Sequence, residues 1–140
     1  TYSPPMAVAP INQVRRVVEY AVTRIPAEKI DLGIPNYGYD WTLPFTEGIS
    51  RARTIGNIEA VQLAAENNAE IFFSETAQSP YFFYNDGAAE HEVWFEDVRS
   101  MQARFDLIKE FGLRGAGYWQ IMRLFRANWI LAEDNFRIIR

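Results

Sequence analysis

Two short apolar runs that contain glycine and end in clustered aromatic residues constrain the fold more than any other feature. They are Lys29–Trp41 (KIDLGIPNYGYDW) and Arg114–Met122 (RGAGYWQIM). Each run lies next to amphipathic helical stretches, a pattern typical of parallel strands that are covered by helices. Ligands bind at the carboxyl ends of such strands. We therefore expect an α/β fold in which the aromatic residues stand at a ligand-binding edge.

Composition excludes several classes of protein. About half of the 140 residues are apolar and the formal net charge is −4, which suits a globular domain with a substantial core. No apolar run approaches the roughly 20 residues of a membrane span, and the scattered arginines argue against nucleic acid as a partner. The absence of cysteine and the single His91 leave few metal ligands. We predict no metal, no cofactor, no nucleic acid and no membrane partner.

Hydrophobic periodicity and capping residues predict the outer elements. A helix with an apolar stripe that includes Val17 and Val18 should run from Ile11 to Ile25, and Pro26 should end it. The other expected elements are a strand over 30–36, a helix from Asp97, its cap, to Phe111, a strand over 115–121 and a helix over 127–134. Gly112 should end the second helix. A loop carrying Tyr39, Asp40 and Trp41 should follow the first strand.

The stretch 45–96 changes character. Asn57 is a candidate cap for a helix over 58–67, and three strand-like runs follow at 70–74, 81–84 and 91–96. Asn85–Gly87 has the composition of a hairpin turn. Only alternate members of Tyr81–Tyr84 can share one sheet face, so we expect this aromatic run to serve mainly as the core of an inserted α+β unit.

The outer pattern of helix, strand, insertion, helix, strand and helix is incomplete as a fold. Two parallel strands cannot close a barrel or form a stable doubly wound sheet. The chain also begins at Thr1 rather than at methionine. We expect it to be the terminal portion of a larger βα-repeat protein.

Four runs, in order, carry a resemblance to a known family. PPMAVAP, KIDLGIPNYGYDWTLPF, TAQSPYFFYND and HEVWFEDVRSMQARFDLIKEFGLRGAGYWQIM resemble the C-terminal part of family 18 glycoside hydrolases. The similarity is to the spore germination and cortex-lytic N-acetylglucosaminidases of spore-forming bacteria, and it covers essentially the whole chain. It implies a partial TIM (β/α)8 barrel, with its last two strands and their helices in residues 1–44 and 97–140. Residues 45–96 would be the α+β insertion.

The resemblance also implies an activity and a location. Family members hydrolyse N-acetylglucosamine linkages in chitin or peptidoglycan, using the substrate's own acetamide as nucleophile and a glutamate as acid. The acid motif D-x-x-D-x-D-x-E is absent from this sequence, so we assign no catalytic residue and expect the chain alone to be inactive. The implied partners are a glycan and the missing N-terminal barrel half. The implied location is the spore or cell wall, outside the cytoplasm.

The substrate-binding residues follow from the same resemblance. Trp119 matches the tryptophan that forms the floor under the cleaved sugar, although a place in the barrel core is the alternative. Tyr37, Tyr39 and Asp40 would bind sugar hydroxyls, or belong to a loop that hydrogen-bonds to itself. Trp41 would line the cleft or anchor the insertion.

Two functional classes remain open at this point. The chain is either part of a glycosidase whose acid lies elsewhere, or a non-catalytic carbohydrate-binding or assembly module. Unpaired strand edges predict self-association in both cases.

Two carboxylates raise separate questions. Asp97 is better explained as a helix cap than as an acid paired with Glu96, and Asp31 within a strand must meet water or a partner.

Overall fold

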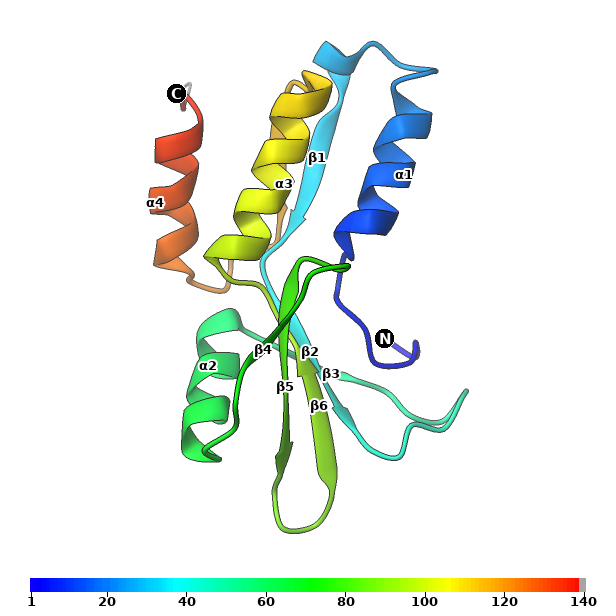
Figure 1. The fold of residues 1–140 in the computed structure, drawn as a ribbon, viewed down its shortest axis with the longest axis vertical. Helices are drawn as coiled ribbons and strands as arrows, with labels where there is room; N and C mark the ends of the chain where they lie inside the picture. The colour runs from blue at the N-terminus through cyan, green and yellow to red at the C-terminus, as the bar shows by residue number, and fades with distance from the viewer. Residues whose placement is uncertain (139–140) are drawn as a thin grey trace.

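The computed structural model describes residues 1–138 and has two parts, one at each end of its long axis (Figure 1). One part holds the parallel strands β1 (Asp31–Pro35) and β7 (Gly115–Trp119) with three helices. The other holds a five-stranded antiparallel sheet with one helix. The remaining elements, in chain order, are α1 (Ile11–Ala21), a 3-10 turn (Ala27–Lys29), β2 (Gly38–Thr42), β3 (Arg53–Ile55), α2 (Asn57–Glu66), β4 (Phe72–Ser74), β5 (Ser79–Asn85), β6 (Glu90–Trp94), α3 (Val98–Phe111) and α4 (Arg126–Asn135).

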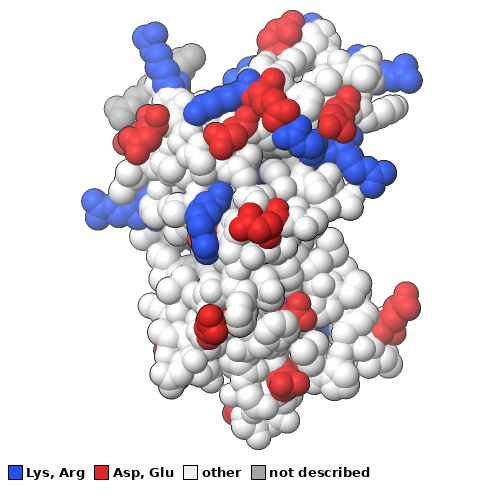
Figure 2. Space-filling view, in the orientation of Figure 1, with Lys and Arg blue, Asp and Glu red and all other residues white. Residues whose placement is uncertain are grey.

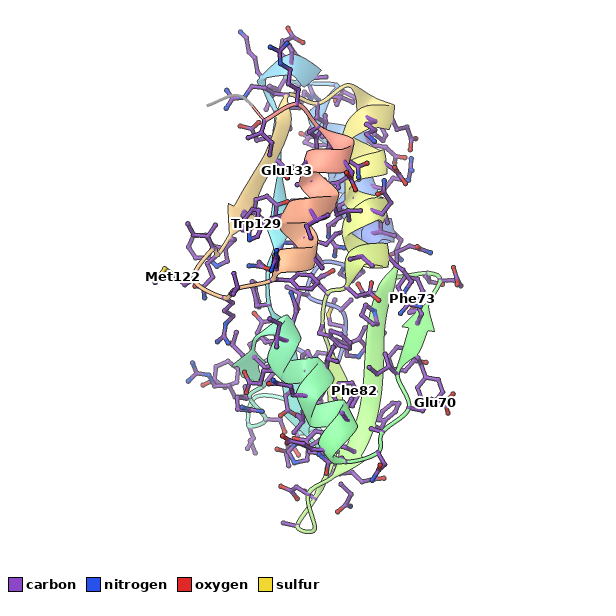
Figure 3. The ribbon with its side chains drawn as sticks, turned by 90° about the vertical axis from the view of Figure 1, so that its left-hand side faces the viewer. Glu70, Phe73, Phe82, Met122, Trp129 and Glu133 are labelled. Atoms are coloured by element: carbon purple, nitrogen blue, oxygen red, sulfur yellow. The ribbon has the colours of Figure 1, made fainter. Side chains whose placement is uncertain are left out.

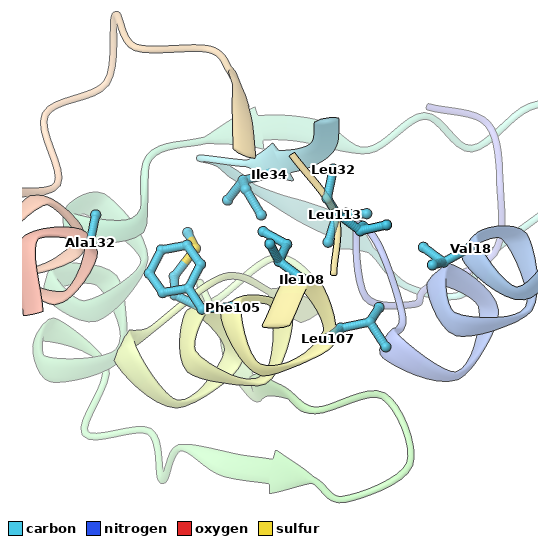
Figure 4. Packing of buried hydrophobic residues seen from close by; sticks show 9 residues of the cluster. Val18, Leu32, Ile34, Phe105, Leu107, Ile108, Leu113 and Ala132 are labelled. Carbon is cyan, nitrogen blue, oxygen red and sulfur yellow. The ribbon is translucent and has the colours of Figure 1, made fainter. Parts of the chain in front are cut away.

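The two glycine-bearing strands pair in parallel, as predicted. Their register runs from Asp31 opposite Gly115 to Pro35 opposite Trp119. Leu32 and Ile34 of β1 point toward the helices, where they pack with Phe105 and Ile108 of α3 (Figure 4). The opposite face carries Gly33 and, at alternate positions, Asp31 and Pro35, and no helix of the described residues covers it. Among residues 1–138, β1 and β7 pair only with each other, and no closed barrel forms.

Helices α1 and α3 begin where the sequence predicts, and α1 ends early. The Asp97 carboxylate accepts hydrogen bonds from the backbone N–H groups of Arg99 and Ser100, and Gly112 ends α3 at a φ of 60°. Helix α1 stops at Ala21, four residues before the predicted end. Val17, expected in its buried stripe, is 66% exposed. The prediction for Val17 was wrong because only the narrow side of α1 that carries Val18 packs against the core.

The antiparallel sheet has the order β3-β2-β6-β5-β4, with α2 packed on one face (Figure 3). Phe82 and Val93 fill the space beneath α2, and the neighbours of Phe82 in β5 point to the other face. Residues Gly38–Thr42 form β2 of this sheet, so the expected loop at Tyr39, Asp40 and Trp41 is wrong. Alternation places these side chains on opposite faces between β3 and β6. The expected boundary at residue 45 falls in the β2–β3 connection, and the division into two units stays a prediction.

Asn57 does not cap α2. It is the first residue of the helix, and its Oδ1 instead accepts a hydrogen bond from the backbone N–H of Glu96 at 3.0 Å. The Glu59 carboxylate accepts a hydrogen bond from the backbone N–H of Gly56 at 3.2 Å and caps the start of the helix.

The predicted hairpin turn is present between β5 and β6, with Gly87 at a φ of 91°. No helix within residues 1–138 has the length and apolar character needed to span a bilayer.

Candidate functional site

The carboxyl ends of β1 and β7 meet, as the sequence predicts for parallel strands. Pro35 lies opposite Trp119, and the backbone N–H of Asn36 donates to the carbonyl of Trp119 at 2.8 Å. The chain leaves β1 through Tyr37 and leaves β7 through Gln120. Two segments about 80 residues apart in sequence therefore form one edge.

Trp119 projects from this edge into open space, with 72% of its surface exposed. It shares a strand face with Gly115 and Gly117, and Gly33 lies opposite Gly117. A Cβ added at Gly33 or Gly117 would meet no atom within 4 Å. Trp119 thus has small neighbours on its strand face, and within the described residues the indole is not sealed in a core.

Asn36 organises the loop that follows Trp119, and sequence reasoning missed it. The buried side chain donates from Nδ2 to the carbonyls of Gln120 at 3.0 Å and Arg123 at 2.7 Å. The intervening Ile121 and Met122 are held outward, where Met122 protrudes from the molecule (Figure 3). The available signal was an amide residue directly after an apolar strand.

Tyr37 and Tyr39 stand next to each other beside this edge. Their ring centroids are 5.4 Å apart with the rings nearly perpendicular, and both side chains are half-buried. Burial and a hydrogen bond with Tyr39 raise the pKa of Tyr37 to about 12. Near neutral pH the Tyr37 hydroxyl therefore keeps its proton and can both donate and accept hydrogen bonds.

Asp40 points to the other face of the sheet and is already fully partnered. Its Oδ2 accepts hydrogen bonds from Arg53 and from the Tyr84 hydroxyl, both at 3.1 Å, while Oδ1 lies 2.9 Å from His91 Nδ1. The carboxylate is 4% exposed. The carboxylate therefore bonds within the protein, but its partners lie on β3, β5 and β6 and not in its own loop, as the second interpretation expected. The sequence separation of up to 51 residues hid these partners.

Trp41 is 1% exposed, and its Nε1 donates to the carbonyl of Ser3 at 2.9 Å. A ring without open surface has no area to offer a ligand. Trp41 instead fastens the N-terminal segment to the antiparallel sheet, which favours the anchoring interpretation over a place in the cleft.

Glu96 and Arg104 form an ion pair at 2.8 Å in which both side chains are fully buried. Arg104 also donates to the carbonyl of Ala9, so it joins α3 to the N-terminal segment. Burial raises the pKa of Glu96 to about 7, although the Arg104 charge acts in the opposite direction. Asp97 next to it is the cap of α3.

Asp31 lies at the surface and pairs with Arg114 at 2.6 Å, so this carboxylate within a strand has both water and a partner.

The edge therefore presents an exposed indole, a phenol hydroxyl and a fixed backbone loop. These groups suit a ligand with both apolar faces and hydroxyl groups. Within residues 1–138, no set of three or more His, Asp or Glu side chains is arranged to hold a metal ion.

Comparison with known proteins identifies the class. The family model "Glycosyl hydrolases family 18" matches residues 4–123, and the chain belongs to this family. The cortical fragment-lytic enzyme of Bacillus subtilis (strain 168) is 51% identical over 138 residues, which are 98% of this chain and 32% of that enzyme. The chain thus spans about a third of the length of the relatives it matches.

Two solved structures share the fold. The spore cortex-lytic enzyme SleL of Bacillus megaterium QM B1551 superimposes with a TM-score of 0.96 at 51% identity, covering 99% of this chain and 33% of that one. A chitinase from Chromobacterium violaceum ATCC 12472 gives a TM-score of 0.87 at 28% identity, covering 96% and 41%. The mixed α/β fold is therefore that of family 18 chitinase domains.

Proposed function

We propose that this chain is the C-terminal, sugar-contacting part of a family 18 glycosidase that hydrolyses N-acetylglucosamine linkages in spore-cortex peptidoglycan or chitin. In this proposal β1 and β7 are the last two strands of a (β/α)8 barrel, and the helix-free face of the pair lines the barrel interior. The exposed Trp119 beside Tyr37 is the observation that carries the proposal. The relatives' cortical fragment-lytic and cortex-lytic activities agree with it.

The proposed mechanism places the acid outside this chain. The substrate acetamide oxygen attacks the anomeric carbon while a glutamate from the acid motif protonates the leaving oxygen, which forms a cyclic oxazolinium intermediate. Water then opens this intermediate, so that the two displacements together retain the configuration. That motif is absent from these 140 residues. The chain supplies the wall on which the reacting sugar rests, with Trp119 under the ring and Tyr37 and Tyr39 toward its hydroxyls. Asp40 supports this wall from the opposite face of the sheet, and Trp41 packs edge to face against Tyr39.

A chimera tests the proposal. The N-terminal two-thirds of the Bacillus subtilis relative, joined to this chain in place of its own C-terminal third, should release fragments from spore cortex at a rate near that of the relative. Trp119→Ala in the chimera should lower kcat/KM at least tenfold, because the sugar loses its stacking surface.

The matched control is Trp129→Ala, a tryptophan that packs beside Tyr118 on the helix side of β7. It should alter stability more than turnover. A folded chimera that binds cortex glycan without cleaving it would favour the alternative, a non-catalytic carbohydrate-binding or assembly module.

A further inference from the structure

The β7–α4 loop, residues 120–125, follows Trp119 directly and is held at two points. The first point lies at the carboxyl end of β1, where Asn36 Nδ2 donates to the carbonyls of Gln120 at 3.0 Å and Arg123 at 2.7 Å. The backbone N–H of Asn36 also donates to the carbonyl of Trp119 at 2.8 Å. One buried residue therefore binds three carbonyls of this segment and fixes the direction in which the chain leaves β7.

The second point lies on the antiparallel part of the molecule. Nη2 of Arg123 donates to the carbonyl of Thr54 in β3 at 3.4 Å, and Nη1 lies 3.7 Å from Oε2 of Glu59 in α2. A Cβ added at Gly56 would lie 3.5 Å from Nη1, so the guanidinium packs along the backbone just before α2. The side chain of Arg123 therefore joins the loop after Trp119 to the start of this helix.

The carboxylate that receives Arg123 is itself fixed. Glu59 pairs with Arg53 at 2.7 Å and accepts from the backbone N–H of Gly56 at 3.2 Å. Arg53 in turn pairs with the buried Asp40 at 3.1 Å. Because Glu59 is bound both to β3 and to the start of its own helix, it offers Arg123 a fixed position.

The charges of the two parts favour this contact. Residues 45–96 contain two arginines, no lysine and nine carboxylates, whereas the rest of the chain has a net positive charge. Figure 2 shows Lys and Arg side chains gathered over the part with the parallel strands, with Asp and Glu scattered over the other. A cation that reaches from the first part to the second is attracted by this field. Because partly exposed ion pairs contribute little stability, we assign the contact a directional role.

The indole of Trp119 depends on its backbone for its orientation. Its neighbours on the strand face, Gly115 and Gly117, have no side chains to pack against the ring, and 72% of the Trp119 surface is exposed. The backbone at the end of β7 is what Asn36 and Arg123 hold. Groups that contact a substrate must be held closely in place by the residues around them.

We propose that Asn36 and Arg123 form a two-point clasp on the β7–α4 loop and act as positioning residues for Trp119. Asn36 sets the path of the backbone at the strand edge, and Arg123 fixes the loop against the antiparallel part. The inference rests on the proposed function, in which Trp119 supports the sugar ring, and it names the residues that act through this indole. A small displacement of a group that orients the substrate lowers turnover.

The first test observes the indole without any ligand. The chain has four tryptophans, whose indole N–H signals are resolved by nuclear magnetic resonance of an isotope-labelled sample, and Trp119→Phe assigns one signal by its loss. Asn36→Ala and Arg123→Met should each shift or broaden the Trp119 signal more than the other three, because the loop after Trp119 gains freedom. Methionine keeps most of the length of the arginine stem and removes the guanidinium.

The second test measures turnover of spore cortex by the chimera described above. Asn36→Ala should lower kcat/KM about fivefold, and Arg123→Met about two- to threefold. Combined with Trp119→Ala, neither variant should lower kcat/KM further, because no ring remains to be positioned. Losses from residues that act independently of Trp119 would multiply with its own.

Two matched controls separate position from stability. Leu107→Ala removes a buried side chain from α3 on the side toward α1 (Figure 4). It should lower the unfolding temperature at least as much as Asn36→Ala does, and leave the Trp119 signal and kcat/KM unchanged. Arg126→Met removes an exposed guanidinium from the first residue of α4 and should change neither.

The outcomes separate this inference from the proposed function. If neither clasp variant moves the Trp119 signal, the clasp is overturned and the proposed function stands. If only Asn36→Ala moves it, the second point at Arg123 is overturned. Losses in kcat/KM that multiply with the loss from Trp119→Ala would overturn the clasp as well. If both variants move the signal but Trp119→Ala leaves turnover unchanged, the positions are confirmed and the proposed role of Trp119 fails.

Discussion

At the scale of single residues, Glu96 is the group whose environment departs most from water. Its side chain is fully buried, Oε1 meets Arg104, and Oε2 has no hydrogen-bond partner. The pKa of about 7 in the folded chain lies above its ordinary value of 4.5. Between these two values the folded state holds a proton that the unfolded chain has lost, so stability must fall as pH rises through this window.

The first prediction follows from that linkage. From pH 4.5 to pH 7 the free energy of unfolding should fall by up to about 3 kcal/mol from this group, since one pKa unit corresponds to about 1.4 kcal/mol. Glu96→Gln, which mimics the protonated form and still accepts from Arg104, should remove this decline. Urea titrations at several pH values measure both profiles.

The control for this prediction is Glu66→Gln, which removes an exposed carboxyl from α2. Its profile should keep the decline between pH 4.5 and 7. A Glu96→Gln profile parallel to that of the wild-type chain would show that Glu96 is ionised in the folded state throughout.

Single residues also mark the limit of what the sequence could predict. Trp119 was identified from the family resemblance, because it lies in one of the four runs that carry it. Asn36, His91 and Arg53 were missed because their roles depend on partners brought together by the sheet and by the β7–α4 loop. Asp40 was left between a sugar ligand and bonds within its own loop, because its actual protein partners lie 13 to 51 residues away.

At the scale of elements, the start of β2 at Gly38 lies close against the end of β6. A Cβ added at Gly38 would lie 2.5 Å from the carbonyl oxygen of Trp94 and 2.8 Å from the Cβ of Phe95. Both neighbours are held by the sheet and cannot move independently of it. Only glycine fits at the start of β2.

The second prediction compares two glycines. Gly38→Ala should lower the free energy of unfolding by about 2 kcal/mol or more, because the clash displaces backbone. Gly117→Ala in β7, where nothing lies within 4 Å, should change it by less than about 1 kcal/mol. Thermal unfolding of both variants gives the comparison. Equal losses would mean that the β2–β6 contact yields without cost.

Elements whose signals are local were predicted well. The ends of α3 at Asp97 and Gly112 were predicted because capping residues act within one helical turn. The β5–β6 hairpin was predicted from its turn residues. The expected loop at 39–41 was wrong because Gly38 and Pro44 are typical of loops, whereas pairing with β3 and β6 decides the structure of the residues between them. The end of α1 was predicted wrongly because tertiary packing covers only part of the apolar stripe of this helix.

At the scale of the whole molecule, the parallel pair is an incomplete sheet. Within residues 1–138, β1 and β7 have no other strand partner, and the face with Gly33 and Gly117 is uncovered. Trp119, Ile121 and Met122 add exposed apolar surface at one end of this pair. Such an edge and face favour association with another chain.

The third prediction is that the chain self-associates in a concentration-dependent way, because pairing of open strand edges and burial of the exposed apolar side chains both favour the dimer. Sedimentation velocity across a hundredfold concentration range should show a shift from monomer toward dimer. Adding the N-terminal two-thirds of the Bacillus subtilis relative should replace the dimer with a one-to-one complex, because under the proposed function that part supplies the strands that pair with the same edges. The complex should also unfold at a higher temperature than the chain alone. A monodisperse monomer at the highest concentration, unaffected by the added half, would show that the parallel pair is stable with its edges open.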